Sequence, residues 1–171
     1  MTDEVDYSDP DHCTVGVVGE VGHRLFLFYC RQGLNETTVK VEKQQIAVLA
    51  SYLGRIVKEL GRPGHLPDDL SFDGTEDPEW VVGTIGVSYD EELDRVVVVL
   101  EEVHDEEEEE EEEESAHVLR IALTREQAAA FAIHATRLVE AGRPPCPLCG
   151  LPLDPSGHDC PRTNGHRPPV T

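Results

Sequence analysis

The sequence predicts an α+β fold, a duplicated β-β-β-α unit with antiparallel meanders, followed by a small C-terminal zinc-ribbon-like module. Three observations predict it: two similar apolar segments far apart in the chain, a helical pattern that closes each repeat, and cysteines spaced as in a metal site. The expected boundaries are a disordered acidic N-terminus at 1–11, units at 12–60 and 80–142, a linker at 61–79, and a zinc-binding module and tail at 143–171.

Each predicted unit begins with two strands joined by a short turn. The first strands, 14–19 and 81–86, share a pattern of glycines between β-branched residues. The second strands, 24–29 and 95–100, each start with an arginine and continue as an apolar run bounded by polar turns. Short apolar runs between turns favour strands, and short connections favour antiparallel neighbours.

A third strand and a helix complete each unit. The third strands, 37–41 and 119–123, alternate apolar and polar residues, and apolar residues at helical spacing follow at 46–57 and 128–139. Thr124 has the place of an N-cap and Gln127 that of its capping-box partner, and Gly-Arg-Pro ends both helices. We expect one helix to cover one sheet in each unit, and the two units to pack with pseudo-twofold symmetry.

The formal net charge of −21 is the strongest compositional feature. Much of it lies in Asp105 and the unbroken glutamates at 106–114, which we interpret as a disordered loop at 104–115, with a tract that binds calcium or a basic partner as the alternative. Such a charge repels nucleic acid and anionic membranes, so neither is the expected partner. The acidic start lacks a signal-peptide pattern and no apolar run approaches the ~20 residues of a membrane span, so a cytoplasmic protein is expected.

The tail carries the most specific chemical motif. Cys146 and Cys149 form a Cys-x-x-Cys turn followed by glycine, and Cys160 supplies a third thiol. A redox pair is the alternative, but the Pro- and Gly-rich tail has almost no core of its own and would need a metal to order it. Structural zinc takes four N or S ligands. We therefore expect one structural Zn²⁺, with a histidine as fourth ligand, and geometry alone leaves both His158 and His166 open.

Other residues carry weaker signals. Arg24 and Arg95 occupy equivalent places and are either solvent-facing strand ends or the two sides of an anion site between the units. Cys13 and Cys30 are expected to be small core residues, and His134 a packed or partly exposed residue of the second helix rather than a catalytic one. No nucleophile–base arrangement is recognisable in the sequence.

The chain resembles domain-of-unknown-function family 3090, a mainly actinobacterial group. The likeness rests on the tail at 142–165, with its Gly-Arg-Pro-Pro-Cys-Pro-Leu-Cys-Gly start, and on 15–19, 82–86 and 125–128. It covers nearly the whole chain, although the long glutamate run is not part of the family pattern. The resemblance implies the zinc ligands Cys146, Cys149, His158 and Cys160, because the place of His166 can hold Tyr in the family. It implies no activity.

Three functions are compatible with these features. The first is a non-enzymatic binding or adaptor protein, whose zinc module presents Arg162, Asn164 and Arg167 to a protein partner. The second is an enzyme or small-molecule-binding protein with its site in the groove between the units. The third is a nucleic-acid-binding zinc ribbon, which the nearly neutral tail disfavours. The absence of a catalytic motif favours the first.

Overall fold

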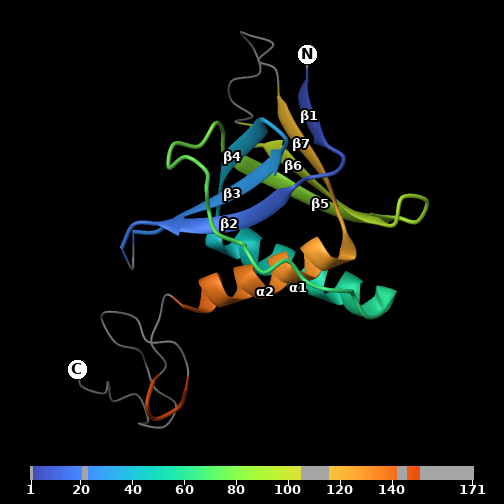
Figure 1. Cartoon of the computed structure of the whole chain (residues 1–171). Helices are drawn as coiled ribbons and strands as arrows, with labels where there is room; N and C mark the ends of the chain where they lie inside the picture. The colour runs from blue at the N-terminus through green and yellow to red at the C-terminus, as the bar shows by residue number, and fades with distance from the viewer. Residues whose placement is uncertain (1, 21–22, 105–115, 142–145, 151–171) are drawn as a thin grey trace. The chain divides into compact units, whose positions relative to one another are not determined.

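The computed structural model describes residues 2–20, 23–104, 116–141 and 146–150 (Figure 1). The chain divides into two compact units, Met1–Val139 and Glu140–Thr171. Both predicted β-β-β-α segments therefore belong to one compact body, and the predicted zinc motif belongs to the other unit. The glutamate run at 106–114 lies outside the described residues.

The body is a mixed α+β structure. Its described residues form seven strands and two helices, namely β1 (Asp3–Tyr7), β2 (His12–Val18), β3 (Leu25–Gln32), β4 (Asn35–Val41), α1 (Lys43–Leu60), β5 (Val82–Asp90), β6 (Arg95–Glu102), β7 (His117–Leu123) and α2 (Arg125–Glu140). The orders β2-β3-β4-α1 and β5-β6-β7-α2 are those expected from the sequence. No helix among the described residues is long and apolar enough to cross a membrane.

The strands form two sheets, of order β2-β3-β4 and β1-β7-β6-β5. All neighbours within the two meanders pair antiparallel, as expected from their short connections. The prediction of a disordered start at 1–11 is wrong for β1, which pairs parallel with β7 from Asp3↔His117 to Tyr7↔Ile121. Its residues are mostly acidic and exposed, so backbone pairing and the buried ring of Tyr7 hold the strand in place.

Residues 79–81 join the two sheets. Lys40 of β4 donates its N–H to the carbonyl of Trp80, and Glu79 donates to Thr38, both at 2.9 Å. On the other side, the N–H of Val103 donates to the carbonyl of Val81, also at 2.9 Å. The end of the predicted linker is therefore part of the β-structure and ties β4 to the end of β6.

The earlier part of the predicted linker lies against the outer face of the three-stranded sheet. Thr14 donates its hydroxyl hydrogen to the carbonyl of Leu70 at 2.7 Å, and the Phe72 ring meets Tyr29 edge-on with centroids 5.8 Å apart. We call residues 70–74 the strap. It buries the face of this sheet that the helices do not cover.

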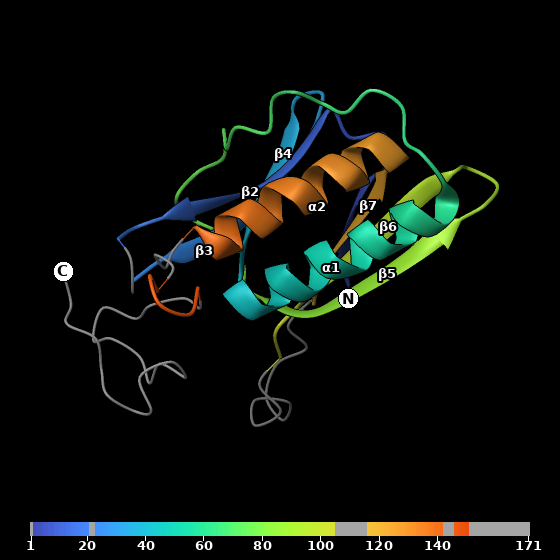
Figure 2. The same cartoon turned by 90° about the horizontal axis from the view of Figure 1, so that it is seen from below.

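The two helices lie side by side on the opposite face of the strands (Figures 1 and 2). One continuous core joins them to both sheets, and the rings of Phe28 and Phe131 meet in it with centroids 5.4 Å apart. The predicted capping box of α2 is confirmed: Thr124 and Gln127 each donate a backbone N–H to the other's side chain, at 3.0 Å. Because each buried side chain of this size contributes about 1.5–3 kcal/mol, the shared core dominates the stability of the body.

Candidate functional site

The Cys-x-x-Cys motif forms a tight turn at 146–150. Gly150 donates its N–H to the carbonyl of Cys146 at 2.8 Å, and its φ of 76° lies in the left-handed region that favours glycine. Cys146 is buried and Cys149 is half-buried. The turn places both cysteines within one short loop, as two thiolate ligands of a single tetrahedral ion require.

The remaining predicted ligands, Cys160 and either His158 or His166, lie outside the described residues. The same holds for Arg162, Asn164 and Arg167. The described residues contain no group of three or more His, Cys, Asp or Glu that would hold a metal ion. Of the predicted zinc ligands, the described residues contain Cys146 and Cys149.

The structure does not bring Arg24 and Arg95 together. Arg95 begins β6, and its guanidinium lies 3.3 Å from the carboxylate of Asp9. Arg24 directly precedes β3. The β2–β3 and β5–β6 connections lie at opposite ends of the body in both views (Figures 1 and 2). The two arginines consequently cannot flank one anion site on the body.

A pocket of about 200 Å³ lies where β1, β4 and β7 meet residues 79 and 80. We call it the junction pocket, because its walls come from the strands of both predicted β-β-β-α segments and from the N-terminal strand. Its lining residues are Asp3, Val5, Thr37, Glu79, Trp80, His117, Val118 and Leu119.

His117 is the best-positioned titratable side chain of this pocket. Its Nδ1 lies 2.7 Å from Oε2 of Glu102, which also accepts the backbone N–H of His117 at 3.2 Å. Its ring stacks on Trp80 with centroids 6.1 Å apart and an interplanar angle of 22°. An ionised carboxylate only accepts hydrogen bonds, so this contact assigns a proton to Nδ1.

The carboxylates around the pocket have shifted pKa values. Burial raises the pKa of Glu79, and repulsion by Glu36 adds to the effect, while His117 opposes it. Burial also acts to raise the pKa of Glu102, but the hydrogen bonds and the charge of His117 outweigh it, and the net pKa is lowered. The surroundings of Glu79 therefore disfavour the ionised form of its carboxyl group.

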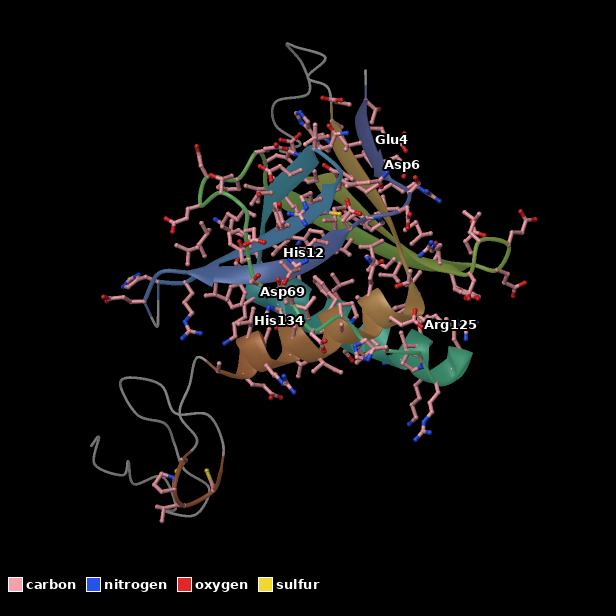
Figure 3. All side chains as sticks on the ribbon, viewed as in Figure 1. Glu4, Asp6, His12, Asp69, Arg125 and His134 are labelled. Atoms are coloured by element: carbon pink, nitrogen blue, oxygen red, sulfur yellow. The ribbon has the colours of Figure 1, made fainter. Side chains whose placement is uncertain are left out.

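A Ser/His/Asp grouping near the strap is not a catalytic triad. His12 donates from Nε2 to the backbone carbonyl of Ser71 at 2.7 Å, and the Ser71 hydroxyl donates to Asp69 at 2.6 Å. The imidazole therefore does not contact the hydroxyl that it would have to activate. Figure 3 shows His12 of β2 and Asp69 on the same side of the body, with His134 of α2 below them.

The expectations for the remaining side chains are confirmed. His134 packs against β2, with Nε2 3.0 Å from the carbonyl of Val15. Cys13 and Cys30 are buried core residues and face each other across β2 and β3. Burial raises the pKa of the Cys13 thiol well above its usual value, which suppresses the reactive thiolate.

The family model described as Protein of unknown function (DUF3090) matches residues 5–160, so the chain belongs to this family. No curated protein and no solved structure matches the chain. The match extends from the third residue of β1 to Cys160 of the tail.

Sequence reasoning missed the junction pocket. Asp3 lies in the segment that was expected to be disordered, and His117 lies two residues after the end of the predicted acidic loop. Trp80, the one tryptophan of the chain, lies two residues before β5. No local pattern connects these residues, because the long-range pairing of β1 with β7 and of residues 79–81 with β4 brings them together.

Proposed function

We propose that this protein is a non-enzymatic binding or adaptor protein with one structural Zn²⁺ in its C-terminal unit. The proposed ligands are Cys146, Cys149, Cys160 and His158, with His166 as the alternative histidine. The observation that carries the proposal is the closed turn at 146–150, with the hydrogen bond from Gly150 to Cys146. Two cysteines in such a turn, with a third cysteine and two histidines in the following residues, match the donor set that zinc prefers.

A closed site with four protein ligands would act as a scaffold. It leaves no open position for a substrate, and its binding energy would order a tail that has few apolar residues. The ordered module would present the surface around Arg162, Asn164 and Arg167 to a protein partner. A cytoplasmic location and a duplicated origin of the two β-β-β-α segments belong to the same proposal. The matching element order of the two segments supports the duplication.

Elemental analysis of the purified full-length chain tests the metal site. We expect one zinc per chain in the wild type and less than a tenth of that in Cys146→Ser. The matched control is Cys13→Ser, which removes a buried thiol of the body and should retain the metal. Retention of zinc in Cys146→Ser, or its equal loss in both variants, would contradict the site. His158→Ala and His166→Ala, measured in the same way, identify the fourth ligand.

The adaptor role needs its own test. We expect the full-length chain to retain a stoichiometric protein partner from native lysate, and Cys149→Ser to lose it while Cys30→Ser keeps it. Because both substitutions exchange a thiol for a hydroxyl, the comparison separates loss of the zinc module from loss of a cysteine. A wild-type chain that elutes alone under native conditions would count against an adaptor.

The junction pocket supports a second candidate, a small-molecule-binding function in the groove between the two segments. The supporting observation is that side chains of β1, β4 and β7 converge on one hollow with an aromatic wall at Trp80. Thermal-shift measurements with a metabolite panel test this candidate. A ligand that stabilises the wild type but not Trp80→Leu supports it. If no metabolite shifts the melting temperature, the candidate is wrong. Nothing in the described geometry favours the nucleic-acid alternative.

A further inference from the structure

The polar groups inside the junction pocket are mostly acceptors. Asp3 and Glu79 contribute carboxylates, and the Thr37 hydroxyl is already hydrogen-bonded to Tyr7 at 2.8 Å. His117 directs Nδ1 toward Glu102 at 2.7 Å, and its Nε2 lies 3.8 Å from Oδ2 of Asp3. The carboxylates of Asp3 and Glu79 are therefore the acceptors that the pocket offers to a ligand.

The charges around the pocket also favour a cationic ligand over a neutral hydrogen-bond donor. None of the eight lining residues is Lys or Arg. Burial raises the pKa of Glu79, and Glu36 repels its charge, so a bound cation would relieve an unfavourable interaction. The formal net charge of −21 adds a long-range attraction of the same sign.

The volume and the apolar lining of the junction pocket limit which organic group can be attached to the cation. A volume of about 200 Å³ is below the ~300–1,000 Å³ of sites for drug-sized ligands, so the ligand is small or inserts only one end. Val5, Val118, Leu119 and the Trp80 ring provide apolar surface next to the carboxylates. Such a wall packs well against a short methylene chain, and an aromatic face attracts a cation.

We propose that the junction pocket binds a small organic cation, a primary ammonium or guanidinium group on a short aliphatic chain, through Asp3 and Glu79. The N–H groups of the ligand donate to these two carboxylates, and its methylene groups pack against the apolar wall. This inference rests on the small-molecule-binding candidate above and is independent of the zinc site.

Isothermal titration calorimetry on the full-length chain tests the proposal, with 1,4-diaminobutane and agmatine as probes and 1-butanol as the neutral comparison. The acidic chain attracts cations non-specifically, so the titrations need physiological salt and charge-matched variants. We expect one site per chain for the amines and none for butanol. Glu79→Gln should weaken binding at least tenfold, whereas Glu92→Gln, which removes the same charge from the exposed β5–β6 turn, should change it less than twofold.

A second matched pair lies on β1. Successive residues of a strand point to opposite sides, so Asp3 lines the pocket while its neighbour Glu4 does not. Figure 3 labels Glu4 and Asp6 on the outer side of this strand. Asp3→Asn should weaken amine binding at least tenfold and Glu4→Gln less than twofold. Thermal unfolding of each variant shows whether a loss comes from the pocket or from unfolding of the body.

The outcomes separate this inference from the functions proposed above. Equal weakening within each matched pair, or no amine binding at all, would overturn the proposal. A neutral metabolite that requires Trp80 while amines fail to bind would overturn the cation but leave a small-molecule function standing. Cys146→Ser should bind amines with the affinity of the wild type, whether or not this substitution removes zinc. Blocked lysine and arginine amides in parallel titrations show whether the same pocket prefers a protein side chain to a free amine.

Discussion

The ring of Phe72 lies directly over the backbone of Gly16. A Cβ atom added at Gly16 would stand 2.5 Å from Cγ of Phe72 and 2.8 Å from its Cβ. These are the inner atoms of the Phe72 side chain, so a rotation of the ring cannot relieve the clash. The strap therefore approaches β2 at a distance that only glycine allows.

Gly16→Ala should destabilise the body by about 1–3 kcal/mol, because the strap must move away from the sheet to accept the methyl group. The measurement is the free energy of unfolding in urea. Gly86→Ala is the matched control, since a Cβ on that strand glycine meets nothing within 4 Å. Similar changes at both positions would show that the strap does not pack on β2 as described.

Gly54→Ala should stabilise the body by about 0.5–1 kcal/mol. Gly54 lies in the interior of α1 on its exposed side, with nothing within 4 Å of an added Cβ, and alanine loses less backbone entropy in a helix than glycine. The urea midpoint should rise with an unchanged slope. A lower midpoint would mean that this face of α1 is covered by another part of the chain or by a second copy.

The raised pKa of Tyr29 predicts that the body loses stability at alkaline pH. Burial, together with the hydrogen bond and the charge of Glu36, raises the pKa of Tyr29 to about 12, against about 10 in the unfolded chain. The folded state thus favours the neutral phenol, so this contribution is complete below about pH 10 and is lost as the pH rises through the folded value. Between about pH 9 and pH 12 the wild type should lose about 2 kcal/mol more than Tyr29→Phe. Parallel pH profiles of the two proteins would refute the assignment.

Removal of zinc should leave the body intact. The body has its own continuous core within Met1–Val139, so its unfolding should not depend on a metal held in the other unit. We expect a chelator to leave the melting temperature of the body within about 2 °C while increasing proteolysis beyond residue 140. If zinc is not bound, the chelator will not change the proteolysis pattern.

The secondary structure and the core were predictable because they depend on short-range patterns. Apolar residues at helical spacing define the buried sides of α1 and α2, and the capping box of Thr124 and Gln127 marks the start of α2. The turn at 146–150 was also predictable, because Cys-x-x-Cys-Gly is a local motif, and its glycine has a left-handed conformation in the structure. In each case the residues that interact are close together in the sequence.

Only the tertiary structure decided where these elements meet. It turned the acidic segment Asp3–Tyr7 into a strand beside β7, packed Phe72 over Gly16, and separated Arg24 from Arg95. It also assembled the junction pocket from residues as distant in sequence as Asp3, Glu79 and His117. Strand pairing uses backbone groups that every residue carries, so the side-chain pattern of a short exposed strand does not specify its partner. The sequence by itself therefore determined the two β-β-β-α segments and the Cys-x-x-Cys turn, whereas the pocket exists only because the two sheets, with the N-terminal strand, pack together.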